Sequence, residues 1–301
     1  MSNERKKMLL VGDNPFHGIS HLSQERARVR GSAITHAEYA AKLVMTSIEN
    51  GANGFMFSVS DTTLSILRMI RETGGSERLR LYTIVPYAYE YVRLVTQIGV
   101  LGLAKKFAKK IVVSGNVRAI AMGLKGVIKT DPMALMKAYL SYEISRIKSS
   151  AGKQANLDSV LLHEVITDMG LALSLDWLFR SYVDFMLKLG IKPGFETRNF
   201  ASLVNKLKEW GVEFDEIVIA TPLNKVGFQM NPSRTECEKA LASLPEPNVI
   251  AMSILAAGYL KPPEAINYIR GLANLKGVVV GVSKEQHARE TFKLFKKKLE
   301  Q

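Results

Sequence analysis

The chain has 301 residues, of which 47% are hydrophobic and 23% charged, as is typical of a folded globular protein, so disordered and fibrous classes are excluded. It has no run near the 18 or so apolar residues that a membrane-spanning helix needs. The apolar run Met8–Val11 is too short for the core of a signal peptide. The single cysteine, Cys237, excludes an internal disulfide and a multi-cysteine zinc site, so we expect a cytoplasmic protein.

The net charge of +13 is concentrated in one segment. Between Tyr91 and Ala155, twelve Lys and Arg residues outnumber two acidic ones, which gives +10 there and leaves +3 elsewhere. A solvated helical face is the commonest reason for such a run, and a lid that attracts an anionic substrate comes next. Nucleic acid and a membrane surface rank behind both, because no nucleic-acid-binding motif is present and few aromatic residues are interleaved.

Eight short apolar runs alternate with longer segments of helical period. This alternation is the pattern of strand–helix units repeated around a parallel sheet. The predicted strands are Met8–Val11, Gly54–Ser58, Leu81–Val85, Ser159–His163, Gly194–Thr197, Glu216–Ala220, Val249–Ile254 and Val278–Val282. We therefore predict a (β/α)₈ TIM barrel, an α/β fold that takes up residues 1–301 as a single domain.

The helix boundaries support this order. Three segments have the spacing of a capping box, in which the first side chain accepts the N–H of the fourth residue. They are Thr35–Glu38, Ser233–Glu236 and Ser283–Gln286. Gly51, Gly190 and Gly211 follow predicted helices, at positions where glycine permits the left-handed turn into the next strand.

The segment after the third strand, residues 88–153, is far longer than one barrel helix. Its helical patterns are interrupted at Gly115-Asn116 and at Thr130-Asp131-Pro132. We interpret it as one barrel helix plus a basic helical insertion that forms a lid. Because it follows a strand, it emerges on the face where barrels carry their chemistry.

Polar residues at strand ends are the candidates for binding and catalysis, because a TIM barrel builds its active site there. The first such loop, Gly12–His21, is especially dense in groups that bind or titrate. The predicted substrate-binding residues are Asp13, Asn14, His21, Glu164, Glu196, Arg198, Asn199 and Asn224. Alternation points Glu196 and Arg198 the same way, so they either contact the substrate or pair with each other.

Three of the five histidines, His17, His21 and His163, fall on this face, where imidazole acts as acid, base or ligand near neutral pH. Structural roles are the alternatives. In these, His21 is solvated, His17 caps a turn, and His163 is a core residue bonded to a backbone carbonyl. His36 and His287 lie in predicted helices and are interpreted as structural.

The end of the eighth strand runs directly into a helix, whose unpaired N–H groups and positive dipole end favour an anion. After the seventh strand, Gly258 permits close approach of the backbone. The predicted residues for a phosphate of a cofactor or substrate are Gly258, Gly281, Ser283 and Lys284. Plain capping of the helix by Ser283 is the alternative.

Several segments resemble the aldo-keto reductase superfamily. Ile250–Leu260 is similar to that family's seventh strand and its small-residue loop, and Val278–Thr291 to its eighth strand and dinucleotide-phosphate helix. Gly51–Thr63 is similar to the second strand with its Asp-Thr-Ala element, and Leu161–His163 to the fourth strand that ends in the catalytic histidine. The resemblance implies a barrel that reduces carbonyl compounds with NADP(H).

The family's tetrad of Asp, Tyr, Lys and His is matched here only by Asp61 and His163. Ile66 stands where the family has its tyrosine, and the third strand offers no lysine. Since isoleucine cannot donate a proton, the family's hydride chemistry requires a substitute acid. The candidates are Tyr87, Tyr89 and His17.

Three hypotheses for the function follow. The leading one is a reductase-like barrel enzyme for a small anionic carbonyl compound, such as a phosphorylated one, with the catalytic residues Asp61, His163, His17 and Tyr87. The second is a hydrolase, aldolase or isomerase with a divalent metal held by His17, Asp61, His163 and Glu196. The third is a non-catalytic barrel that binds an anionic partner through residues 91–155.

Overall fold

The computed structural model of the chain describes residues 7–17, 37–86 and 131–299. Within them, eight parallel strands form a closed barrel in sequence order, with β1 paired to β8. The strands are β1 (Met8–Gly12), β2 (Gly54–Ser58), β3 (Arg80–Val85), β4 (Asn156–Leu162), β5 (Lys192–Glu196), β6 (Val218–Pro222), β7 (Val249–Met252) and β8 (Leu275–Gly281). The predicted TIM barrel is confirmed.

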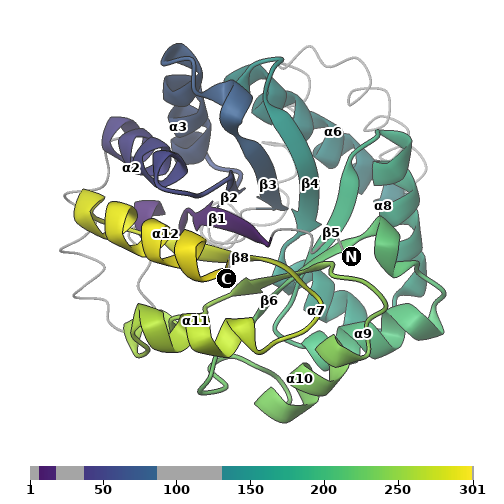
Figure 1. Ribbon diagram of the computed structural model, residues 1–301. Coiled ribbons are helices and arrows are strands. Elements are labelled where there is room, and N and C mark those ends of the chain that lie inside the picture. The colour runs from purple at the N-terminus through teal and green to yellow at the C-terminus, as the bar shows by residue number, and fades with distance from the viewer. Residues whose placement is uncertain (1–6, 18–36, 87–130, 300–301) are drawn as a thin grey trace, which may run out of the picture.

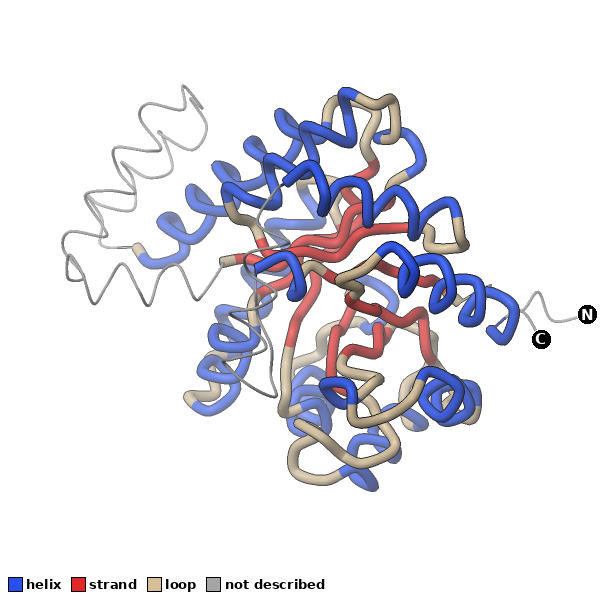
Figure 2. Tube along the Cα trace, turned by 90° about the vertical axis from the view of Figure 1, so that its left-hand side faces the viewer, coloured by secondary structure: helices blue, strands red, loops and turns tan. Residues whose placement is uncertain are grey.

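Helices surround the barrel, and at least one helix lies between each strand and the next (Figure 1). Figure 2 shows the strands at the centre and the helices outside them. The α-helices of the described part are α2 (Ala37–Glu49), α3 (Asp61–Glu72), α6 (Pro132–Ala151), α7 (Glu164–Ala172), α8 (Asp176–Lys188), α9 (Phe200–Glu209), α10 (Arg234–Ala242), α11 (Pro262–Arg270) and α12 (Glu285–Leu299). Short 3₁₀ helices are η1 (Asn14–His17), η2 (Ser76–Arg78), η3 (Phe214–Glu216) and η4 (Ala256–Gly258).

Alternation of side chains along the strands divides the hydrophobic core into two layers. In β2, Phe55 and Phe57 pack outward under the helices, whereas Met56 belongs to the cluster inside the barrel. The inner cluster consists of Met8, Leu10, Met56, Tyr82, Ile84, Leu161, Val218, Ala220 and Ile250. The barrel is therefore a packed core and not a pore, and a binding site has to lie at one of its ends.

A polar cluster lies at the amino-terminal end of the barrel. The Tyr82 hydroxyl donates to Asp158 Oδ2 at 2.9 Å, and Arg80 Nε donates to the same oxygen at 2.5 Å. Burial is the main cause of a raised pKa for Tyr82, and the Asp158 carboxylate adds to it. The carboxylate is thus held by two donors, which satisfies a charge that is costly to bury.

The helix-boundary predictions are confirmed in part. Ser233 caps α10 by accepting the N–H of Glu236, as predicted. The capping box at Ser283 is wrong, because α12 begins at Glu285, and the box at Thr35 lies outside the described residues. The three predicted turn glycines are left-handed, with φ of 122° at Gly51, 69° at Gly190 and 65° at Gly211.

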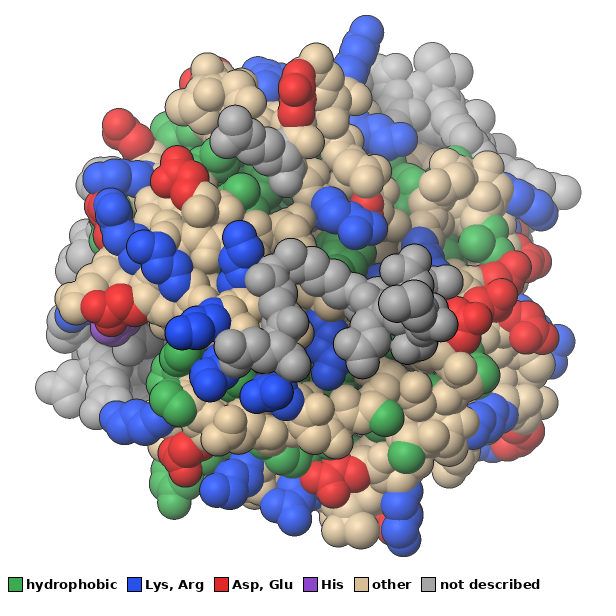
Figure 3. Space-filling view, viewed as in Figure 1, with side chains coloured by type: hydrophobic (Ala, Val, Ile, Leu, Met, Phe, Trp, Pro, Cys, Tyr) green, Lys and Arg blue, Asp and Glu red, His purple; other side chains and the backbone are tan. Residues whose placement is uncertain are grey.

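The barrel helix predicted between the third and fourth strands is α6. Its first turn is capped by Asp131, whose Oδ1 accepts the N–H groups of Met133 and Ala134. The rest of the predicted insertion, with Lys105, Lys106, Lys109 and Lys110, lies outside the described residues. On the face in Figure 3, Lys and Arg side chains are spread over several elements, with acidic ones among them.

In the described part of the chain, the longest helices are too short or too polar to cross a bilayer.

Candidate active site

A cavity of about 390 Å³ opens at the carboxyl ends of the strands. Its floor is the uppermost layer of inward-facing barrel side chains, Met56, Ile84, Met252 and Val279. Its lining includes many of the residues proposed from sequence, namely Asp13, Asn14, His163, Glu164, Glu196, Arg198, Gly258, Gly281 and Ser283. The cavity therefore lies where the barrel rule places an active site.

His163 joins β4 to α7 and serves as the N-cap of that helix. Its Nδ1 accepts the N–H of Val165 at 3.1 Å, so this nitrogen carries no proton of its own. Burial lowers the pKa of His163, and the Arg198 guanidinium adds to this against the opposing charges of Glu164 and Asp168. The imidazole is therefore neutral at pH 7 with its proton on Nε2. Among the residues that the structure describes, no backbone carbonyl accepts from this ring, in contrast to the structural alternative.

Glu196 is the last residue of β5 and faces the same cavity. Its Oε2 lies 3.9 Å from His163 Nε2, and its side chain is only 13% exposed. Burial raises the pKa of Glu196 to about 8, and the negative charges of Glu164 and Asp13 add to the rise. Glu196 is thus mostly protonated at neutral pH, and its proton is available to a molecule in the cavity.

The two other carboxylates of the cavity are held by stronger partners. Glu164 Oε2 accepts from Arg198 Nε at 2.6 Å. Arg198 therefore pairs with Glu164, whereas one alternative from the sequence paired it with Glu196. Asp13 is buried, and its Oδ2 accepts the Ser58 N–H at 2.7 Å and lies 3.1 Å from His17 Nε2. These pairs fix two negative charges beside Glu196, which is one reason why that residue keeps its proton.

The wall formed by the loop after β7 and the end of β8 has a different character. It contains Ser253, Leu255, Gly258, Gly281, Ser283 and His287, and none of the described residues on it is acidic. Four residues of the loop after β7 have left-handed backbone: φ is 50° at Ser253, 45° at Ala256, 59° at Ala257 and 94° at Gly258, and all of these except Ala256 line the cavity. Three non-glycine residues in that region carry strain of about 1 kcal/mol or more each, a feature that clusters at binding sites.

Comparisons with known proteins identify the fold. Neither a family model nor a curated protein sequence matches the chain. Two structures from Pseudomonas aeruginosa, both described as aldo-keto reductases, match 97% of this chain and 90% of their own length. They have TM-scores of 0.60 and 0.61 at 12% and 11% sequence identity. The chain has the barrel fold of the aldo-keto reductases.

A further match is a structure from Anabaena variabilis described as a sugar phosphate isomerase/epimerase. It has a TM-score of 0.50 and 10% identity, and the match covers 98% of this chain and 99% of that one. The two Pseudomonas aeruginosa structures support, at the level of the fold, the resemblance to aldo-keto reductases seen in the sequence.

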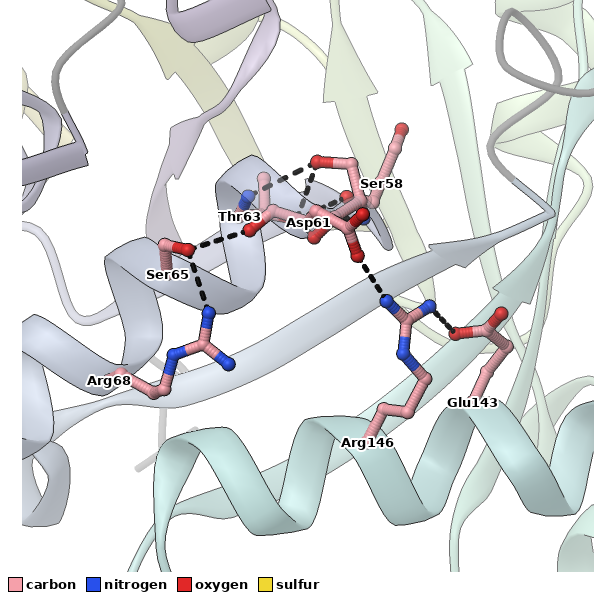
Figure 4. Close-up of polar contacts among 8 residues, drawn as sticks. Ser58, Asp61, Thr63, Ser65, Arg68, Glu143 and Arg146 are labelled. Carbon is pink, nitrogen blue, oxygen red and sulfur yellow. Dashed lines mark hydrogen bonds and ion pairs between the residues drawn. The ribbon is translucent and has the colours of Figure 1, made fainter. Parts of the chain in front are cut away.

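Asp61, the aspartate of the aldo-keto reductase resemblance, is not in the cavity. It is the first residue of α3, its side chain is 83% exposed, and its Oδ1 accepts from Arg146 Nη2 at 2.5 Å (Figure 4). Arg146 also binds Glu143, its neighbour on α6, at 3.0 Å. The structure therefore places Asp61 in a link between α3 and α6, where it is too far out for the acid–base role predicted from the sequence.

Ile66, at the position of the aldo-keto reductase tyrosine, is fully buried in the layer between barrel and helices. Of the substitute acids, Tyr87 and Tyr89 lie outside the described residues, as does His21. His17 does not line the cavity, and its Nε2 lies 3.1 Å from Asp13 Oδ2. Among the described carboxyl groups that line the cavity, Glu196 is the one whose pKa is raised to about 8.

Three other predicted binding residues do not line the cavity. Asn224 is fully buried, and its amide both donates to and accepts from the backbone of Phe228, which organises the loop after β6. Asn199 precedes α9, and its backbone N–H donates to Thr197 Oγ1, whose hydroxyl in turn donates to Asp168. Lys284 is exposed at the start of α12 and does not line the cavity.

The predicted metal quartet is not assembled. Asp61 is directed to Arg146, and His17 to Asp13. Within residues 7–17, 37–86 and 131–299, no group of three or more His, Cys, Asp or Glu side chains is arranged to hold a metal ion. The structure therefore does not bring the four proposed ligands together.

Sequence reasoning also missed lining residues. His287, interpreted as structural, lies in the first turn of α12 and lines the cavity. Ser58, Gln229 and Ser253 line it as well. The strand-end rule would have found Ser58, the last residue of β2, whereas the orientation of His287 depends on where α12 begins.

Proposed function

We propose that this protein is an aldo-keto reductase-like enzyme that reduces a small anionic carbonyl compound with NADP(H) in the mouth of the barrel. The observation that carries the proposal is the pair formed by neutral His163 and buried Glu196, 3.9 Å apart in a cavity of about 390 Å³. Carbonyl reduction requires that the developing alkoxide be stabilised and then protonated. One group of this pair suits each task.

In this proposal His163 Nε2–H donates a hydrogen bond to the carbonyl oxygen. Its N-cap bond to Val165 fixes the ring and keeps the proton on the cavity side. Glu196, whose pKa is raised to about 8, gives its proton to the same oxygen as negative charge develops there. Glu196 thereby takes the part of the tyrosine that Ile66 replaces.

The wall of Ser253, Gly258, Gly281, Ser283 and His287 fits the cofactor. Anionic phosphates are favoured there because the described lining of this wall has no carboxylate, and the first N–H groups of α12 lie beside it. At Gly258, no described residue other than its chain neighbours lies within 4 Å of where a Cβ would be, so backbone approach is open. When bound, the nicotinamide supplies a hydride to the carbonyl carbon.

Arg198 completes the binding of the substrate. It lines the cavity and is one-third exposed, so it can face an anionic substrate group while Glu164 holds its other edge. Phosphorylated carbonyl compounds are the first class to test, because one structural neighbour bears the name of a sugar phosphate isomerase/epimerase.

A cytoplasmic location stays a prediction from the single cysteine, Cys237.

The test is a titration with NADPH and NADH, followed by fluorescence, and then an NADPH oxidation assay with phosphorylated aldehydes and 2-oxo acids. We expect saturable NADPH binding that Ser283→Glu weakens, since the new carboxylate would repel the phosphate. An absence of binding by the wild-type protein at millimolar NADPH would refute the reductase proposal.

A further inference from the structure

The carboxyl group of Glu196 accepts weaker hydrogen bonds than the other carboxyl groups that line the cavity. Within the described part of the chain, its one hydrogen bond is a long one, from the Glu164 N–H at 3.3 Å to Oε2. By contrast, Asp13 and Glu164 are each fixed by bonds of 2.7 Å or less. Glu196 is therefore the carboxyl group in the cavity that can exchange a proton with a bound molecule without first breaking an ion pair.

His163 is oriented to act on the same molecule. Because its Nδ1 is occupied by the Val165 N–H, its Nε2–H is the edge toward Glu196. A carbonyl oxygen and a hydrogen on the adjacent carbon are only a few bonds apart. The 3.9 Å between the two side chains lets one small molecule meet both, with its oxygen at His163 and its adjacent C–H at Glu196.

We propose that this site also catalyses enolisation, the exchange of a proton on the carbon next to the carbonyl group, without any cofactor. Glu196 Oε removes the proton, the C–H electron pair forms a carbon–carbon double bond, and the carbonyl π pair moves to oxygen. The enolate oxygen is stabilised by His163 Nε2–H. Return of a proton from Glu196 to the same carbon restores the carbonyl compound, so no oxidant or reductant is consumed.

The surroundings of Glu196 set the pH at which this reaction runs. Burial raises its pKa most, and the charges of Glu164 at the start of α7 and Asp13 in the β1–η1 connection add to the rise. The Glu164 N–H and Arg198 after β5 lower it, and neutral His163 lies opposite. With a pKa of about 8, the carboxylate is scarce at pH 6 and abundant at pH 9. Enolisation therefore increases between these pH values, whereas reduction, which needs the protonated acid, decreases.

The inference rests on the substrate class of the proposed function, but its test does not involve NADPH. Cofactor-free protein is mixed in D₂O with dihydroxyacetone phosphate or with 2-oxobutyrate, and loss of the α-proton signal is followed by ¹H NMR. We expect wild-type protein to exchange at least one of the two probes faster than buffer. Glu196→Gln and His163→Asn should each slow the catalysed rate by about 100-fold or more.

The variants are chosen to keep the fold intact. His163→Asn removes the imidazole but keeps a side chain that caps helices well, and Glu196→Gln keeps the shape of the side chain. Asp61→Asn, outside the cavity, is the matched control and should exchange at the wild-type rate. Melting temperatures of all variants distinguish loss of chemistry from loss of folding.

The outcomes separate this inference from the proposed function. Exchange at the buffer rate for both probes, or a Glu196→Gln variant as fast as wild type, would overturn the inference even if NADPH-dependent reduction is found. Exchange without NADPH binding would support the inference and refute the reductase proposal. An exchange rate that does not increase from pH 6 to pH 9 would also contradict the enolisation inference, because carboxylate formation at Glu196 would then not be limiting.

Discussion

The raised pKa of Glu196 predicts a stability effect that depends on pH. Below about pH 4.5 the carboxyl group is protonated in both the folded and the unfolded chain. Between that pH and about 8, the unfolded chain releases a proton that the folded protein keeps. The wild-type protein therefore loses up to about 1.4 kcal/mol of stability per pH unit from this group, with an upper bound of about 5 kcal/mol over the range.

Glu196→Gln removes the titrating group and should remove this loss. A chain of this size changes its melting temperature by about 2 °C per kcal/mol. The melting temperature of the variant minus that of wild type should therefore increase by about 3 °C for each pH unit between 5 and 8. Thermal unfolding followed by circular dichroism at four pH values measures it. Glu246→Gln, at an exposed position, controls for the loss of one charge. If the gap between variant and wild type is the same at pH 5 and pH 8, the carboxyl group is not protonated as we infer.

Further predictions test the described contacts one by one. His163→Ala should lower stability by about 1 kcal/mol relative to His163→Asn, because alanine cannot accept the Val165 N–H; urea unfolding measures the difference. Tyr82→Phe should cost about 1 to 2 kcal/mol in the same assay, since Asp158 loses a buried donor. Cys237 is buried and burial raises its pKa to about 11, so a thiol reagent should label it only upon unfolding; rapid labelling of native protein would contradict its placement. Asp61→Asn should cost less than about 1 kcal/mol and leave the rate of carbonyl reduction unchanged, because the carboxylate is exposed and outside the cavity.

The fold could be predicted because a parallel barrel repeats one simple pattern. Every predicted strand exists, and only the ends differ. β8 begins at Leu275, three residues before the predicted start at Val278. The prediction started too late because Gly277 interrupts the apolar run in the sequence. That glycine is needed inside the barrel, where a Cβ would lie 2.6 Å from the Met8 carbonyl oxygen. A residue chosen for close approach of neighbouring strands thus hides the strand in the sequence.

The candidate site was harder to predict, since its chemistry depends on contacts between distant segments. The strand-end rule found both His163 and Glu196, but it could not give their protonation states. Those depend on burial and on charges from distant positions in the chain: Glu164 and Asp13 act on Glu196, and Arg198 acts on His163. Likewise, the family motif singled out Asp61, whereas its direction is determined by Arg146, 85 residues later.

The central claim is that the pair of His163 and Glu196 performs the chemistry at the mouth of the barrel. The most direct measurement is the NADPH oxidation rate with the panel of phosphorylated aldehydes and 2-oxo acids for wild type, Glu196→Gln, His163→Asn and Asp61→Asn. We expect turnover by wild type and Asp61→Asn, and a loss of about 100-fold or more in the other two. Turnover that survives Glu196→Gln and His163→Asn but is abolished by Asp61→Asn would contradict the claim and move the active centre to α3.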